Sequence, residues 1–225
     1  MRDIWAALPV KALAGAKQRL SAALSPAQRQ GLMRAMLGDV LAALAAAPLA
    51  GIVVNTADAE VAALARDHGA RVVCLDADRG HTAAVTALAR LLAAEGHAGL
   101  LTVPGDIPAI TAAEIATLIA AHGAAPAISI VPAHDRRGSN AILCTPPDAL
   151  AFAFGDDSFL PHLATARAGG IEPRIVTLAG IGMDVDHPAD LAMLLDAPQA
   201  QGTRAVAFLR AAGIRPPSSR NLRAG

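Results

Sequence analysis

The sequence predicts an α/β protein: a single domain with a mostly parallel central sheet and helices on both of its faces. Up to Pro132, apolar runs of strand length alternate with longer helical patterns, which is the rhythm of parallel strands joined by crossover helices. The chain has 225 residues, of which 54% are hydrophobic and 17% charged, so it can bury one sizeable core. The predicted domain spans residues 1–213, and the Pro-, Ser- and Arg-containing tail 214–225 is expected to be disordered.

The expected strands are short aliphatic runs that end in loop residues. The run that begins at Leu100, for example, ends in Pro104-Gly105-Asp106. In order, the predicted strands are Ile4–Leu8, Ile52–Asn55, Arg71–Leu75, Leu100–Val103, Ala127–Val131, Ala141–Cys144 and Arg174–Leu178.

The expected helices are marked by their ends. Ser25 and Thr111 each stand three residues before Gln or Glu, which is the capping-box pattern, and Gly69 and Gly96 close two other helices. In order, the predicted helices are Ser25–Ala46, Ala57–His68, His81–Glu95, Thr111–His122, Ser158–Ala168, Pro188–Leu195 and Gly202–Ala212.

Composition excludes several classes of function. Aromatic residues are 2% of the chain and the formal net charge is zero, which argues against nucleic-acid binding and against an anionic membrane surface. No apolar stretch is long enough to span a bilayer, and no signal peptide is recognisable, so we expect a cytoplasmic protein. Cys74 and Cys144 lie in apolar runs and are expected to be free, buried thiols. The sequence allows a homodimer but does not indicate the oligomeric state.

A cationic loop follows the first predicted strand. The only two lysines of the chain, Lys11 and Lys17, lie there with Gly15 and Arg19. A strand end that opens into a basic, glycine-containing loop suits a polyanion such as a nucleoside triphosphate. The alternative is a solvated basic loop without a ligand.

A lone carboxylate is predicted at the tip of the fourth strand. Asp106 follows Pro104-Gly105, and Pro108 delays the next helix. A carboxylate at such a strand tip is a good Mg²⁺ ligand, because Mg²⁺ takes one or two carboxylates together with phosphate oxygens. The alternative is an aspartate that only stabilises a turn.

A second carboxylate motif is the pair Asp184 and Asp186 in GIGMDVDHPADL. Residues two apart on an extended segment point the same way, and a divalent cation would relieve the repulsion between their charges. The alternative is a turn before the helix at Pro188, with Asp186 as the N-cap. His187 adjoins this pair, and neither it nor His162 is assigned a role.

Two polar segments complete the candidate site. Gly138 and Ser139 in RRGSN could bring backbone amides and a hydroxyl to a carboxylate or phosphate, or could form a plain hairpin turn. Gly155 and Ser158 in FGDDSF could hold an anion at a helix start, or Ser158 could be a simple N-cap.

Convergence makes these separate motifs one candidate site. Ligands of such sheets bind beyond the carboxyl ends of the strands, so Lys11, Lys17 and Asp106 should meet at one edge. GxSxG, GxxxxGK[ST] and GxGxxG motifs do not occur, which disfavours hydrolase-elbow, P-loop and dinucleotide-binding functions.

Together the motifs resemble those of one family, the phospholactate guanylyltransferases of deazaflavin coenzyme (coenzyme F-420) biosynthesis, which have a Rossmann-like nucleotidyltransferase fold. The matching segments are PVKALAGAKQRLS, GDVLAAL, VPGDIPAIT, GSNAIL, FGDDSFLPHLATA and MDVDHPADL, in the order of the family and over nearly the whole chain. Ser139 stands where the family usually has threonine, which keeps the hydroxyl.

The resemblance implies transfer of GMP from GTP onto the phosphate of 2-phospho-L-lactate, phosphoenolpyruvate or 3-phospho-D-glycerate. It implies that the metal ligands are Asp106, Asp184 and Asp186, and the expected metal is Mg²⁺. It also implies that the acid is bound by Ser139, Gly155 and Ser158. The loop with Lys11, Lys17 and Arg19 would hold the GTP phosphates, and Lys17, Arg19 and Asp106 would serve catalysis.

The expected mechanism is in-line attack of an acid phosphate oxygen on the α-phosphorus of GTP, with release of pyrophosphate. Three alternatives remain open on the sequence. They are a DxD metal-dependent glycosyltransferase that uses a nucleotide sugar, a cytidylyl- or uridylyltransferase with the same chemistry, and a non-catalytic nucleotide-binding regulator.

Overall fold

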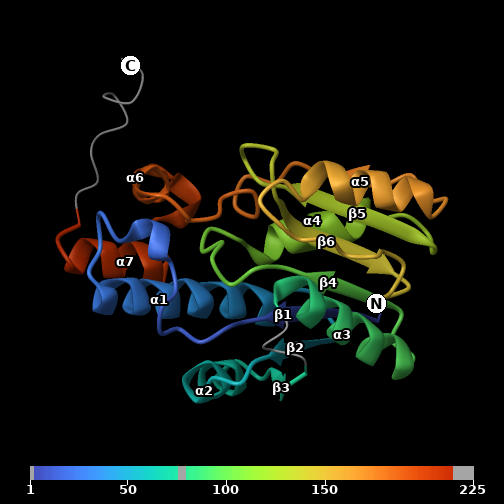
Figure 1. The fold of residues 1–225 in the computed structure, drawn as a ribbon, viewed down its shortest axis with the longest axis horizontal. Coiled ribbons are helices and arrows are strands. Elements are labelled where there is room, and N and C mark those ends of the chain that lie inside the picture. Colours follow the sequence, from blue (N-terminus) through green and yellow to red (C-terminus); the bar gives the residue numbers. More distant parts are fainter. Residues whose placement is uncertain (1–2, 76–79, 215–225) are drawn as a thin grey trace.

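The computed structural model describes residues 3–75 and 80–214, and it has a seven-stranded sheet in the order β3-β2-β1-β4-β6-β5-β7 (Figure 1). β6 runs antiparallel to its neighbours β4 and β5, and the other strand pairs are parallel. The predicted mostly parallel α/β sheet is therefore confirmed.

The elements follow the predicted order. The strands are β1 Ile4–Pro9, β2 Gly51–Asn55, β3 Arg71–Val73, β4 Gly99–Thr102, β5 Ala127–Pro132, β6 Ser139–Thr145 and β7 Arg174–Ile175. The α-helices are α1 Pro26–Ala45, α2 Ala59–Asp67, α3 His81–Ala94, α4 Ala112–Ala121, α5 Phe159–Ala168, α6 Pro188–Asp196 and α7 Arg204–Ala211. Short 3₁₀ helices lie at Gln18–Leu20 and Pro198–Ala200.

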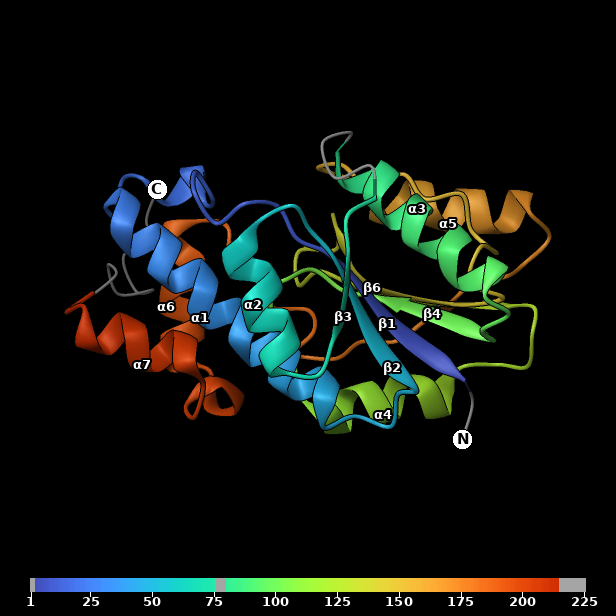
Figure 2. The same ribbon diagram turned by 90° about the horizontal axis from the view of Figure 1, so that it is seen from below.

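Helices cover both faces of the sheet, as predicted. Figure 2 shows α3 and α5 together on one side of the strands and α4 on the other. Leu88 of α3 and Leu163 of α5 belong to one buried cluster, whereas Leu41 of α1, Val61 of α2 and Ile115 of α4 belong to the cluster on the opposite face. The alternating side chains of β1 serve both clusters, which is why its sequence is apolar throughout.

A third apolar cluster lies beyond the sheet, where α1 meets α6 and α7 (Figure 1). Leu32 and Met36 of α1 pack there with Leu191 of α6 and Val206 of α7. Asp39 of α1 accepts hydrogen bonds from the backbone amides of Arg204 and Ala205 at 2.8 and 2.9 Å, so it holds the start of α7. This cluster anchors the segment that carries the Asp184–Asp186 motif.

Helix boundaries lie close to the predicted ones because the capping signals operate. Ser25 and Gln28 form the predicted capping box of α1. The Thr111 hydroxyl caps α4, but the side chain of Glu114 accepts from the Gly180 amide at 2.7 Å instead of completing a box. α2 begins at Ala59 rather than at the predicted Ala57, because Asp58 is its N-cap and accepts from the amides of Glu60 and Val61.

The prediction for the cysteines was right for Cys144 and wrong for Cys74. Both are free thiols, and Cys144 is buried in β6, but Cys74 is exposed. The reason is topological: β3 is the edge strand and ends at Val73, so Cys74 lies just beyond it. Residues 215–225 of the predicted tail lie outside the described residues. Within the described part of the chain, the helices are all too short or too polar to cross a bilayer.

Candidate active site

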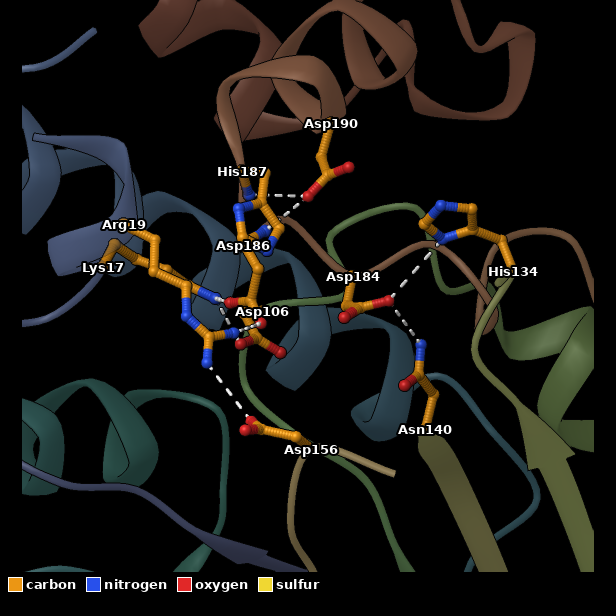
Figure 3. Close-up of polar contacts among 10 residues, drawn as sticks. All are labelled: Lys17, Arg19, Asp106, His134, Asn140, Asp156, Asp184, Asp186, His187 and Asp190. Atoms are coloured by element: carbon orange, nitrogen blue, oxygen red, sulfur yellow. Dashed lines mark hydrogen bonds and ion pairs between the residues drawn. The ribbon is translucent and has the colours of Figure 1, made fainter. Parts of the chain in front are cut away.

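Charged side chains from three distant segments meet beyond the carboxyl ends of β1 and β4. The loop after β1 contributes Lys17, the turn after β4 contributes Asp106, and the segment before α6 contributes Asp186 (Figure 3). Lys17 Nζ lies 2.5 Å from Asp106 Oδ2 and 2.6 Å from Asp186 Oδ1. The predicted meeting of Lys17 with Asp106 at this edge is therefore observed, and Asp186 joins them there.

The Lys17 ammonium bridges two carboxylates in a largely enclosed place. Its side chain is only 7% exposed, against 23% for Asp106 and 38% for Asp186. Burial alone would lower the pKa of Lys17, but the charges of Asp106 and Asp186 outweigh it and raise that pKa. Burial likewise opposes ionisation of Asp186, yet Lys17 lowers the pKa of this carboxyl below its usual value.

The backbone of Lys17 turns its side chain toward the site. Lys17 has φ 55° and ψ 45°, the left-handed conformation that a residue with a side chain rarely adopts, just before the 3₁₀ helix at Gln18. Such a conformation costs on the order of 1 kcal/mol or more and persists where surrounding contacts enforce it. Here the two ion pairs supply those contacts.

Asp184 lies beside this cluster but has other partners. Its Oδ1 accepts from Asn140 Nδ2 at 3.1 Å, and His134 Nδ1 lies 3.9 Å away (Figure 3). Burial raises the pKa of Asp184, and the charges of Asp106 and Asp186 raise it further against the opposing Asn140 hydrogen bond. In the part of the chain that the structure describes, no group of three or more His, Cys, Asp or Glu side chains is gathered as a metal centre.

Backbone contacts lock the two aspartate segments together. The amide of Val185 donates to the carbonyl of Asp106 at 3.1 Å, so the DxD motif runs alongside the strand tip. Gly180 makes this approach possible, because a Cβ atom there would overlap the carbonyl of Ala109. The first glycine of GIGMDVD, Gly180, is thus explained by a close backbone contact.

The alternative role proposed for Asp186, that of N-cap to the helix at Pro188, is not observed. His187 occupies the N-cap position of α6. Asp190 of the same helix accepts from the amides of Asp186 and His187 at 2.9 and 2.7 Å (Figure 3). Asp190 therefore satisfies the helix start and leaves the Asp186 carboxylate to Lys17.

Arg19 and Lys11 are both exposed and flank the cluster. Arg19 is exposed and lies 3.2 Å from Asp156 Oδ1 and 3.6 Å from Asp186 Oδ2. Lys11 and Gly15 line a cavity that also reaches Lys17, Asp106 and Asp186. The basic loop therefore borders an open space next to the carboxylates, large enough for a ligand beside β1.

A second cavity adjoins the first and holds the other predicted residues. Ser139, Gly155 and Ser158 line it together with Asp106 and Asp184. The Ser158 hydroxyl makes no capping bond to α5; it accepts from the Ser139 amide at 3.2 Å. A Cβ atom on Gly155 would meet no heavy atom of residues 3–75 and 80–214 within 4 Å, so packing among these residues does not require glycine there.

Sequence reasoning missed several residues that shape this cavity. His162 is fully buried and lies 3.0 Å from Ser139 Oγ through Nδ1, and Asn140 holds both Asp184 and the Ile181 carbonyl. Asn140 stands beside Ser139 in the quoted GSN motif, and His162 stands in FLPHLATA, but one sequence gives no signal for which histidine faces a site.

The sequence is similar to a known protein family over most of its length. The sequence profile described as "Guanylyl transferase CofC like" matches residues 4–223. The chain belongs to this CofC-like family. This CofC-like chain is 39% identical over 192 residues to the phosphoenolpyruvate guanylyltransferase of Rubrobacter xylanophilus, covering 85% of this chain and 93% of the relative. It is 32% identical to the 2-phospho-L-lactate guanylyltransferase of Methanothermobacter thermautotrophicus, covering 91% and 89% of the two chains.

Solved structures support the fold of this CofC-like protein. A putative nucleotide-diphospho-sugar transferase from Desulfovibrio desulfuricans superposes with a TM-score of 0.74 at 18% identity, covering 95% of this chain and 96% of that one. A nucleotidyl transferase from Methanothermobacter gives a TM-score of 0.64 at 19% identity, with 93% and 99% coverage. The expected nucleotidyltransferase fold is confirmed.

Proposed function

We propose that this CofC-like chain is a guanylyltransferase that moves GMP from GTP onto the phosphate of a small phosphorylated acid in coenzyme F-420 biosynthesis. In the reaction, an oxygen of the acid phosphate bonds to the α-phosphorus of GTP. The bond from that phosphorus to the oxygen leading to the β-phosphorus breaks, and pyrophosphate leaves. The products are a diphosphate-linked guanosine adduct of the acid and pyrophosphate, so no redox partner and no covalent enzyme intermediate are required.

The observation that carries this proposal is the meeting of Lys17 with Asp106 and Asp186 between two adjoining cavities. Phosphoryl and nucleotidyl transfer need positioning and charge neutralisation more than covalent chemistry. We assign the cavity beside Lys11, Lys17 and Arg19 to GTP and the cavity beside Ser139, Gly155 and Ser158 to the acid. The α-phosphorus would then lie near the boundary, where Asp106 lines both cavities.

Magnesium is part of the proposal, and the residues present fit it. Asp106 Oδ1 is buried without a hydrogen-bond partner among the described residues, which suits a carboxylate oxygen reserved for a ligand. Asp106 and Asp186 already share the Lys17 ammonium, and Asp184 lies two residues before Asp186 in the chain. Hard oxygen ligands for Mg²⁺ are therefore available. When bound, Mg²⁺ would supply charge neutralisation for the reacting phosphates.

Lys17 and Arg19 would act on the nucleotide side of this arrangement. Lys17 is a buried cation held by two carboxylates, and Arg19 has a long, exposed side chain at the rim of the cavity. Both could meet the β- and γ-phosphates as these gain charge during pyrophosphate release. We therefore assign Lys17, Arg19 and Asp106 as the groups that serve catalysis.

Among the three candidate acids, phosphoenolpyruvate is tested first. The relatives from Rubrobacter xylanophilus and two Roseiflexus species, at 36–39% identity, are named phosphoenolpyruvate guanylyltransferases. The relatives named for 2-phospho-L-lactate and 3-phospho-D-glycerate are both 32% identical. The cytoplasmic location and the oligomeric state remain predictions.

The test measures pyrophosphate release from each nucleoside triphosphate with Mg²⁺ and each of the three acids. We expect release only with GTP and one of these acids, and none when either partner is omitted. A nucleotide-sugar glycosyltransferase would release no pyrophosphate, and a nucleotide-binding regulator would bind GTP without turnover. Release with CTP or UTP in place of GTP would identify a different nucleotidyltransferase.

A further inference from the structure

The wall of the acid cavity is held from behind by one buried histidine. His162 on α5 has no exposed surface, and its imidazole lies between β6 and the segment that precedes Gly155. On one side, Nδ1 lies 3.0 Å from Ser139 Oγ. On the other side, Nε2 lies 3.0 Å from the backbone nitrogen of Ala153.

These two contacts determine where the proton of the imidazole lies. A backbone N–H can only donate, so Nε2 must accept from Ala153 and carry no proton. A neutral imidazole then has its proton on Nδ1 and donates it to Ser139 Oγ. Burial, followed by the nearby charge of His81, lowers the pKa of His162 to about 4, which keeps the ring neutral at ordinary pH.

The donation from His162 sets the direction of the Ser139 hydroxyl. Because Ser139 Oγ accepts from Nδ1, its own hydrogen must point away from the imidazole. Ser158 Oγ in turn accepts from the Ser139 amide, so its hydrogen is also free to turn outward. Neither hydroxyl donates to a protein acceptor within residues 3–75 and 80–214, and both side chains line the acid cavity.

The same imidazole also holds the loop that carries Gly155. It accepts a hydrogen bond from the amide of Ala153, which is two residues before Gly155. The ring of Phe154 packs against the imidazole, with the two ring centroids 4.8 Å apart. One side chain thus ties Ser139 on β6 to the loop that carries Gly155. Two parts of the acid cavity that come from different elements therefore share His162 as a support.

We propose that His162 is a positioning residue for the phosphorylated acid: its neutral imidazole aims the Ser139 hydroxyl into the cavity and holds the Ala153–Gly155 loop around it. This inference rests on the proposed function, because it assigns the acid to that cavity. His162 does not touch substrate; it acts through Ser139 and the loop.

Steady-state kinetics of two variants provide the test. His162→Phe keeps an aromatic ring, which can pack against the neighbouring phenylalanines, but it loses both hydrogen bonds. In His162→Asn, the side-chain amide can still donate to Ser139. We expect KM for the acid to rise about tenfold or more in His162→Phe and less in His162→Asn, with KM for GTP within about twofold of wild type. Equal rises in both KM values, or no rise, would overturn the inference.

A double-mutant cycle separates positioning from general damage. His162→Gln can still accept from the Ala153 amide but no longer donates to Ser139, so alone it should raise KM for the acid. If His162 acts through the Ser139 hydroxyl, then Ser139→Ala combined with His162→Gln should bind the acid no worse than Ser139→Ala alone, within about twofold. Fully additive losses would overturn the proposed route. This cycle avoids His162→Phe and therefore remains decisive if that variant does not fold.

A measurement that does not require turnover checks the tautomer. ¹⁵N NMR of the wild-type imidazole at pH 7 should show a neutral ring protonated on Nδ1. A ring protonated on Nε2, or a charged ring, would overturn the inference even in a fully active enzyme. If wild type releases no pyrophosphate with GTP and any of the acids, the proposed function fails, and the inference that rests on it fails as well.

Discussion

The Nζ atom of Lys17 lies 2.5 Å from Oδ2 of Asp106, although 89 positions separate the two residues in the chain. The contact joins the loop after β1 to the turn after β4, which are adjacent parallel strands. Asp186 accepts from the same ammonium at 2.6 Å and brings in the segment before α6. Three segments that are remote in sequence are thus held at one point by one cation.

Replacing Asp106 by asparagine should abolish most of the activity while leaving the fold intact. Asparagine keeps the shape but loses the charge, and Lys17 retains Asp186 as a partner. We expect kcat to fall by about 100-fold or more, with Tm nearly unchanged. The matched control is Glu172→Gln, which removes an exposed carboxylate paired with Arg167 and should leave kcat unaltered. Full activity in Asp106→Asn would refute the role given to this carboxylate.

Replacing Lys17 by methionine should destabilise the protein most when divalent cations are absent. Without the ammonium, Asp106 and Asp186 lose their shared partner and only the exposed Arg19 stays beside Asp186, and we expect a loss of roughly 1–3 kcal/mol in the free energy of unfolding in EDTA. This is less than for a fully buried pair, because both aspartates keep some solvent contact. Mg²⁺ should restore part of the loss.

The control for Lys17 is Lys11→Met in the same loop. Lys11 is exposed and forms no ion pair among the described residues, so its loss should change stability by less than about 0.5 kcal/mol. Urea unfolding with and without Mg²⁺ measures both variants. An equal loss in the two variants, or a loss in Lys17→Met that Mg²⁺ does not reduce, would contradict the shared-cation account.

Gly155→Val tests whether the glycine keeps space for the acid. A Cβ atom at this position meets no atom of the described residues within 4 Å, and Gly155 lines the acid cavity, so the branched side chain should enter that cavity. We expect KM for the acid to rise at least about tenfold while Tm and KM for GTP stay close to wild type. Unchanged kinetics would show that the acid does not approach Gly155.

Lowering the pH should destabilise wild type more than a variant without the buried histidine. The pKa of His162 is lowered to about 4 by burial and by His81, so the unfolded chain binds more protons between about pH 6.5 and pH 4. Between pH 7.5 and pH 5, this group should cost wild type about 2 kcal/mol of unfolding free energy. Urea unfolding of wild type and His162→Asn at both pH values checks it; an equal pH dependence would contradict a neutral, buried imidazole.

Much of the fold could be predicted because local signals determine it. The buried strands read as aliphatic runs, and the caps at Ser25 and Thr111 set helix starts by side-chain hydrogen bonds that need only neighbouring residues. The antiparallel β6 and the edge position of Cys74 depend on which strands pair, which no local pattern specifies.

The candidate site was predictable to the level of its segments but not of its contacts. Parallel strands place their following loops at one edge, so the meeting of Lys17 with Asp106 could be expected. The role of Asp190 in holding the start of α6, and the link from His162 to Ser139, require the three-dimensional packing of α5 and α6. Spacing alone cannot show which buried polar side chains satisfy one another.

The most direct test of the account follows the α-phosphorus of GTP. Wild type is incubated with Mg²⁺, phosphoenolpyruvate and GTP that carries a radioactive label on either the α- or the γ-phosphorus, with the other two acids in parallel reactions. We expect that with one of the acids the α-label appears in a guanosine adduct of that acid and the γ-label in pyrophosphate. Recovery of the α-label only in GDP or free GMP, or of the γ-label on the acid, would contradict guanylyl transfer.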